Sequence, residues 1–133
     1  MKINDTFSSW DEILQDVPQS SILGPLLFNI YLNDLFLLQL EANICNFADD
    51  NTFHAYDLSL NNLIKKLESS AKLVIQWFHD NGMKLNDSKC KLLIAGNKEE
   101  VIIATVGNLK IIESQKLTLL GTCIDRGLNL MIM

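Results

Sequence analysis

The stretch from residue 44 to residue 55 reads Ile44-Cys45-Asn46-Phe47-Ala48-Asp49-Asp50-Asn51-Thr52-Phe53-His54-Ala55. Apolar and β-prone residues lie on both sides of an Asp-Asp-Asn tip, a pattern typical of a β-hairpin whose turn carries two adjacent carboxylates. Asp and Asn are also common in turns that contact nothing but water. The tip taken alone therefore leaves a purely structural turn open as an alternative.

A helix is predicted before this hairpin, from about residue 22 to residue 38. Its apolar residues recur at helical spacing, and Pro25 falls in the first turn, where a missing N–H costs nothing. In the preceding loop, Ser20 or Ser21 can cap the helix. The run is apolar enough to be mistaken for a membrane span. We expect a buried helix instead, because polar side chains that would be costly in lipid interrupt it: Asn29, Asn33, Asp34 and Gln39.

A second, longer helix is predicted after the hairpin, from about residue 58 to residue 80. One face carries an apolar stripe at i, i+3 and i+4 spacing, which is typical of packing against a core. Asn81-Gly82 ends the helix, and we expect Trp77 and His79 at the edge of the core. The stripe consists of Leu60, Leu63, Ile64, Leu67, Ala71, Val74, Ile75 and Phe78.

The two ends of the chain favour short strands. Residues 1–15 predict a small hairpin around Asn4-Asp5-Thr6, with a helix from Ser9 to Gln15 as the alternative. Further strands are expected at Leu92–Ala95 and Lys116–Ile124. A hairpin is expected around Gly107-Asn108.

Hairpins and helices in turn indicate an α+β fold, an antiparallel sheet with two helices packed on one face. At 133 residues without an internal repeat or linker, the chain is expected to be a single domain.

Charge and cysteine content restrict the classes of function. The formal net charge is −5, and residues 3–64 contain nine acidic residues but no Lys or Arg. An acidic half cannot hold a phosphate backbone by itself, so we expect little nucleic-acid binding from this chain alone. Cys45, Cys90 and Cys123 form no CxxC pair, which favours reduced thiols in an intracellular protein, nuclear or cytoplasmic. No membrane association and no signal peptide are predicted.

Four segments follow one another along the chain: Val17–Leu35, Phe47–Asp50, Trp77–Cys90 and Leu119–Asp125. Together they resemble the palm blocks of the reverse transcriptases of non-LTR retrotransposons, in the same order. Phe47-Ala48-Asp49-Asp50 resembles that family's aromatic-Ala-Asp-Asp box. The resemblance implies a partial polymerase palm, RNA-directed DNA polymerase activity, and an RNA template and a DNA primer as partners of the intact enzyme.

The chemistry of that family explains the carboxylates. Nucleotidyl transfer uses two Mg²⁺ ions about 3.5–4 Å apart to activate the primer hydroxyl and to neutralise the developing charge. Magnesium prefers oxygen ligands and keeps water and phosphates in its shell. By resemblance, Asp49 is the principal metal ligand and Asp50 supports the site or binds metal more weakly, both as catalytic residues. Phe47 helps to form the floor of the substrate site.

Three further residues acquire roles through the same resemblance. Gln19 would lie beside the incoming nucleotide and the template base, and Lys89 would act as a general acid near the departing pyrophosphate. Ser20 follows Gln19 where the family has Gly, a residue that allows close backbone approach to a ligand. Taken without the resemblance, Gln19 and Lys89 would be a local hydrogen-bonding residue and a solvated surface charge.

The resemblance also indicates what this chain does not contain. Its single domain, residues 1–133, would be a truncated reverse transcriptase domain with palm blocks from the Pro-Gln loop onward. The fingers, the first catalytic block with its facing carboxylate, and the thumb would be absent. We therefore expect the chain to be inactive alone and to bind Mg²⁺ weakly. The alternative is a non-enzymatic mobile-element remnant or a protein-interaction fragment.

Overall fold

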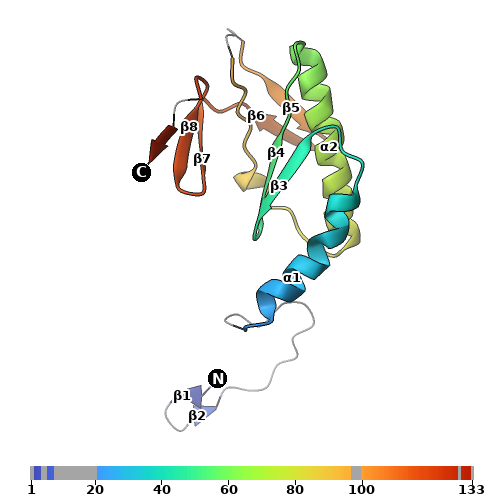
Figure 1. Ribbon diagram of the computed structural model, residues 1–133, viewed down its shortest axis with the longest axis vertical. Helices are drawn as coiled ribbons and strands as arrows, with labels where there is room; N and C mark the ends of the chain where they lie inside the picture. The colour runs from blue at the N-terminus through green and yellow to red at the C-terminus, as the bar shows by residue number, and fades with distance from the viewer. Residues whose placement is uncertain (1, 4–5, 8–20, 97–99, 129, 133) are drawn as a thin grey trace. The chain divides into compact units, whose positions relative to one another are not determined.

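The computed structural model describes residues 2–3, 6–7, 21–96, 100–128 and 130–132. Helices and antiparallel strands are mixed along the chain, so the predicted α+β class is confirmed (Figure 1). The chain divides into two compact units, residues 1–34 and residues 35–133, and each is described by itself.

The first unit contains a small hairpin and a helix. β1 (Lys2–Ile3) pairs antiparallel with β2 (Thr6–Phe7), as predicted, whereas the alternative helix from Ser9 to Gln15 lies outside the described residues. α1 (Gly24–Leu32) begins with Pro25 in its first turn. Ahead of the helix, the Ser21 Oγ accepts a hydrogen bond from the Leu23 N–H at 3.2 Å.

The first helix is shorter than predicted, and it is not the buried helix that was expected, because Leu26, Leu27 and Ile30 are exposed. After α1 the chain continues as a 3₁₀ turn, η1 (Asn33–Leu37), in place of an α-helix to residue 38. The α-helix ends at Asn33-Asp34, two residue types that have low helix propensity. Across the part of the chain that the structure describes, no helix has the length and apolar character needed to span a membrane.

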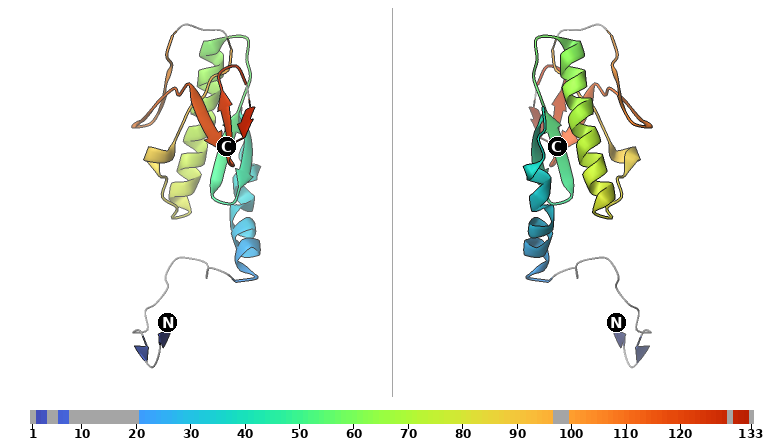
Figure 2. Two further views of the ribbon diagram at one scale, coloured as in Figure 1. Left: turned by 90° about the vertical axis from the view of Figure 1, so that its left-hand side faces the viewer. Right: turned by 90° about the vertical axis from the view of Figure 1, so that its right-hand side faces the viewer.

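The second unit is built around one long helix, α2 (Leu60–Asp80). Three antiparallel sheets belong to this unit in place of the predicted single sheet. The sheets are β3 (Asn43–Phe47) with β4 (Asp50–His54), β5 (Ile103–Val106) with β6 (Leu109–Ile112), and β7 (Lys116–Leu119) with β8 (Thr122–Asp125) and β9 (Leu130–Ile132). α2 contacts β4 and β5, and Figure 2 shows it running alongside their two sheets.

Two predicted strands are wrong. Leu92–Ala95 forms no strand, and Leu92 makes just an isolated parallel bridge with Glu113. The single strand over Lys116–Ile124 is a hairpin, because the chain reverses at Leu120-Gly121. Both turn residues have positive φ, 48° and 81°, the signature of a type I′ turn, whose usual sequence is Asn-Gly rather than Leu-Gly.

The core lies between α2 and the strands. Ser70, Val74 and Phe78 are buried on one face of α2 at four-residue spacing. Val74 and Phe78 belong to the predicted stripe, but Ser70 does not. Trp77 is half-buried as expected, whereas His79 is exposed. The other buried apolar residues of this unit are Leu35, Ala42, Ile94, Ala104, Val106 and Cys123.

Ser70 joins α2 to the start of β3. Its Oγ accepts hydrogen bonds from the backbone N–H groups of Glu41, at 3.1 Å, and Ala42, at 2.9 Å. The neighbouring Ser69 is exposed, and its Oγ donates to the Glu41 Oε2 at 3.0 Å. Because Ser70 is fully buried, water cannot replace it as the acceptor for these two N–H groups.

Contacts between residues close together in sequence stabilise both ends of α2. Near its start, the Lys66 ammonium lies 2.8 Å from the Asp57 carboxylate, and this hydrogen-bonded contact lowers the pKa of Asp57 and raises that of Lys66. At its end, the Met83 N–H donates to the Phe78 carbonyl at 2.8 Å and the Gly82 N–H to the His79 carbonyl at 3.1 Å. Gly82 has φ +71°, so the predicted Asn81-Gly82 stop is a Schellman motif.

A buried ion pair connects the chain after β6 to the chain after β8. The Arg126 Nε lies 3.1 Å from the Glu113 Oε1, and the Glu113 side chain is completely buried. The other carboxylate oxygen, Oε2, accepts from the Ile102 N–H at 3.1 Å. A buried carboxylate is tolerable when it is paired and hydrogen-bonded in this way.

We predict that Ser70→Ala lowers the free energy of unfolding by about 1–3 kcal/mol, because it leaves two N–H groups without an acceptor. Ser69→Ala is the matched control. It removes an exposed hydroxyl, so its effect should stay within about 0.5 kcal/mol. Urea denaturation of both variants measures the difference, and equal effects would contradict the role assigned to Ser70.

The turn at Leu120 gives a second prediction. A left-handed conformation costs a side-chained residue about 1–2 kcal/mol, and Asn tolerates it best. Leu120 is exposed and loses little burial on substitution. Leu120→Asn should therefore raise the free energy of unfolding by about 0.5–1 kcal/mol. Leu58→Asn, at an exposed leucine outside the left-handed region, should give no such gain; a gain there of the same size would refute the explanation.

Candidate functional site

The predicted hairpin is present, but its turn consists of Ala48 and Asp49 rather than the Asp-Asp-Asn tip, because Asp50 and Asn51 already belong to β4. Phe47 pairs with Asp50 as the last rung of the ladder, and Ala48 and Asp49 form the turn. Ala48 has φ +52°, a left-handed conformation that a side chain disfavours. Backbone strain of this kind persists where the surrounding structure enforces it, and it is frequent at functional sites.

Two asparagines hold the tip in this conformation. Asn46 and Asn51 face each other across the hairpin, and the Asn46 Nδ2 donates to the Asn51 Oδ1 at 3.1 Å. The same Nδ2 donates to the Ala48 carbonyl at 2.8 Å, and the Asn51 Nδ2 donates to the Asp49 carbonyl at 3.4 Å. Both turn carbonyls are thus tied to the strands, which fixes where Asp49 projects.

The two carboxylates of the tip are exposed. Asp50 is the cross-strand neighbour of Phe47, so these two side chains lie on the same face of the hairpin. Phe47 is 64% exposed, which leaves an aromatic surface open beside a carboxylate. Within the described residues, the Asp49 and Asp50 side chains make no hydrogen bond or ion pair, so their oxygens are available to a ligand.

The donor set of the tip suits a hard divalent cation. Exposed carboxylate oxygens are the ligands that Mg²⁺ takes, together with water and phosphate oxygens. Among the residues that the structure describes, no group of three or more His, Cys, Asp or Glu side chains could hold a metal ion. Asp49 and Asp50 would therefore supply only part of the coordination shell of such a cation.

Lys89 lies on a separate segment of the same unit. It ends the short 3₁₀ turn η2 (Asp87–Lys89) and is exposed. No ion pair within the described ranges joins it to the Asp49-Asp50 tip. An open depression of about 540 Å³ lies beside η2, lined by Lys84, Leu85, Asn86, Asp87 and Ser88. The predicted substrate residues Gln19 and Ser20 lie outside the described residues.

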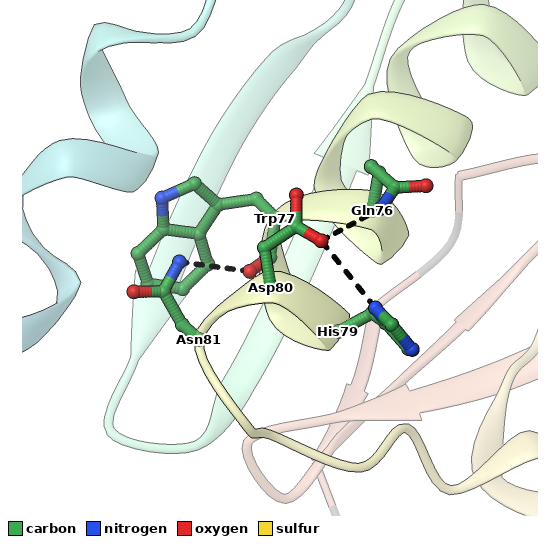
Figure 3. Close-up of polar contacts among 5 residues, drawn as sticks. All are labelled: Gln76, Trp77, His79, Asp80 and Asn81. Carbon is green, nitrogen blue, oxygen red and sulfur yellow. Dashed lines mark hydrogen bonds and ion pairs between the residues drawn. The ribbon is translucent and has the colours of Figure 1, made fainter.

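The end of α2 carries a group of polar contacts, drawn in Figure 3. The Asn81 Nδ2 donates to the Trp77 carbonyl at 2.9 Å, which caps the helix. The Asp80 carboxylate accepts from the Gln76 Nε2 at 2.8 Å and lies 3.4 Å from the His79 Nδ1. His79 and Asp80 are mostly exposed, so we assign this group to the helix terminus rather than to chemistry.

A comparison with known families identifies the chain. A profile of the family described as reverse transcriptase (RNA-dependent DNA polymerase) matches residues 3–124, which is most of the 133 residues. The chain belongs to the reverse transcriptase family. The search among curated proteins and the search among solved structures gave no significant match.

Membership of the reverse transcriptase family gives the exposed tip a context that its geometry alone lacks. The match spans both the Asp49-Asp50 tip and the segment with Lys89. Sequence reasoning located these residues but missed Asn46, Asn51 and Ser70, which position the tip. The signal for the asparagine pair was their equal spacing from the turn, since Asn46 lies two residues before Ala48 and Asn51 two residues after Asp49.

We predict that Asn46→Ala loosens the tip without unfolding the protein. The substitution removes the hydrogen bonds to Asn51 and to the Ala48 carbonyl, so amide exchange at residues 48–51 should accelerate by about tenfold. Asn43→Ala, at the far end of β3, is the control and should leave those amides unchanged. Unaltered exchange in Asn46→Ala, followed by NMR, would show that the asparagine pair does not hold the turn.

Proposed function

We propose that this chain supplies the metal-bearing hairpin of a reverse transcriptase palm, of the non-LTR retrotransposon type, and that it does not polymerise DNA by itself. The observation that carries the proposal is the hydrogen-bonded turn at Ala48-Asp49, which presents two exposed carboxylates within a chain of the reverse transcriptase family. A catalytic metal ligand requires this combination of rigidity and exposure.

Each residue of the tip has a stated role. Asp49, at the turn, is the principal Mg²⁺ ligand, and Asp50 is a second, weaker ligand. Bound Mg²⁺ would activate the primer hydroxyl and stabilise the charge on the transferred phosphate. Phe47 shares a face with Asp50 and forms an apolar floor beside it. Gln19 and Ser20 contact the nucleotide, and Lys89 protonates the leaving pyrophosphate.

The charge pattern supports the proposal that this chain does not polymerise DNA by itself. The tip provides two adjacent carboxylates, which repel each other until a cation is shared with further ligands. Residues 3–64 contain no Lys or Arg, so nothing near the tip in sequence holds template or primer phosphates. RNA template and DNA primer would therefore be bound by a more complete enzyme, and an additional carboxylate would complete the metal site. We place such an enzyme inside the cell.

Metal binding at the tip provides the direct test. Mn²⁺ should broaden the NMR signals of residues 47–51 at millimolar concentrations, and Asp49→Ala should abolish the broadening. Asp87→Ala, at an exposed acid in η2, is the matched control and should leave it intact. If the NMR signals of the tip stay sharp while those of other residues broaden, the assignment of Asp49 as a metal ligand is wrong.

Primer extension on an RNA template tests whether the chain polymerises DNA by itself. The purified chain should give no extension above background with Mg²⁺ or Mn²⁺, since each 1.36 kcal/mol of lost metal stabilisation lowers the rate about tenfold. Extension that Asp49→Ala abolishes would show that another carboxylate, such as Asp34 or Asp16, completes the site. In that case the chain would be an active polymerase, and the inactivity proposed here would be wrong.

A further inference from the structure

The outer edge of β3 carries backbone groups that no described strand pairs with. β3 and β4 form a two-stranded sheet. A two-residue turn is closed by a hydrogen-bonded pair, here Phe47 with Asp50, and hydrogen-bonded and non-hydrogen-bonded pairs then alternate along the ladder. The N–H and C=O groups of Ile44 and Asn46 consequently point away from β4.

This edge lacks the features that normally prevent strands from pairing. Natural edge strands carry charged residues, proline or bulges, which discourage a second chain from adding to the sheet. β3 reads Asn-Ile-Cys-Asn-Phe and contains no charge and no proline, and its register with β4 is regular over all five residues. β4, in contrast, carries Asp50 and His54 at its two ends.

We propose that β3 pairs with β3 of a second copy of this chain, antiparallel about a two-fold axis at Cys45. Cys45 is the middle residue of β3. Ile44 and Asn46, whose backbone N–H and C=O groups point away from β4, lie on either side of it. In this register, Ile44 of each copy exchanges both backbone hydrogen bonds with Asn46 of the other. The product is a continuous sheet in the order β4, β3, β3, β4.

The symmetry of the edge favours a second copy over an unrelated strand. A two-fold interface uses the same surface on both partners, and the outward N–H and C=O groups of Ile44 in one copy face those of Asn46 in the other. A two-stranded hairpin is marginally stable alone, and extension to four strands removes the unpaired edges of both β3 strands. Because β3 itself carries no charged residue, no like charges meet within the paired residues 43–47.

The proposed register places the two Cys45 residues opposite each other as a non-hydrogen-bonded pair. In such pairs the Cα atoms lie about 4.5 Å apart, which is within the range of about 4.4–6.8 Å that a disulfide spans. Cys45 is exposed and its thiol is free. Oxidation can therefore report on the register, because each of two thiols gives up a proton and an electron to an added diazene oxidant, which is reduced to a hydrazine.

Cross-linking of the full chain tests the register. Brief oxidation should give a covalent dimer whose linkage, mapped by mass spectrometry of peptides, joins Cys45 to Cys45. Cys90→Ser should cross-link equally well, since burial and the nearby Asp87 raise the pKa of the Cys90 thiol and keep it less reactive. Cys45→Ser should abolish the covalent dimer but keep the non-covalent one. Linkage mainly through Cys90 would overturn the proposed register.

A pair of proline variants tests which edge is used. Ile44 and Phe53 lie on the same rung and point their N–H groups to opposite outer edges of the hairpin. Ile44→Pro removes an N–H that the proposed dimer uses, so the dissociation constant in sedimentation equilibrium should rise by about tenfold or more. Phe53→Pro is the matched control and should leave dimerisation unchanged, with circular dichroism confirming that both variants fold.

Two outcomes would overturn the proposal directly. One is a wild-type chain that sediments as a monomer at every concentration at which it stays soluble. The other is loss of the dimer in Phe53→Pro with retention in Ile44→Pro, which would place the contact on β4. The cross-linking measurement uses the wild-type chain, so the proposal remains testable if either proline variant fails to fold.

Discussion

The hydrogen bonds that the Ser70 hydroxyl accepts from Glu41 and Ala42 fix the position of the Asp-Asp hairpin. A helix and a hairpin that are linked only by apolar packing can slide past each other, because dispersion contacts are not directional. A buried hydroxyl that accepts two particular N–H groups defines one register. The start of β3 is therefore set by α2, and the turn at Asp49 follows from the length of the two strands.

The tip itself illustrates how local strain and side-chain bonding balance. Ala48 adopts a conformation that favours glycine, and the hairpin gains no hydrophobic burial at its exposed tip. The amide of Asn46 compensates by binding both the opposite Asn51 and the strained turn. The side chain of Asn46 therefore holds the part of the turn from which Asp49 projects.

Local elements of this chain were predictable from sequence, whereas the way they combine was not. The helical stripe with Val74 and Phe78, the Asn81-Gly82 stop and the hairpin at Gly107-Asn108 depend on residues close together in sequence. Ser70 was missed because a serine on an apolar stripe resembles a break in the pattern, and its partners are 28 and 29 residues away. The turn at Leu120-Gly121 was missed because leucine rarely takes a positive φ.

The division into small sheets has a related cause. Alternation of apolar and polar residues shows that a segment is extended, but it carries little information on which extended segment it will pair with. In the second unit, the ion pair between Arg126 and Glu113 and the hydrogen bond that the Ser114 N–H donates to the Leu92 carbonyl join segments that ladders do not. Such bonds link segments without extending a sheet, and they leave strand edges open. β3 keeps one edge that no described strand pairs with, and this edge is the feature from which a partner strand is inferred.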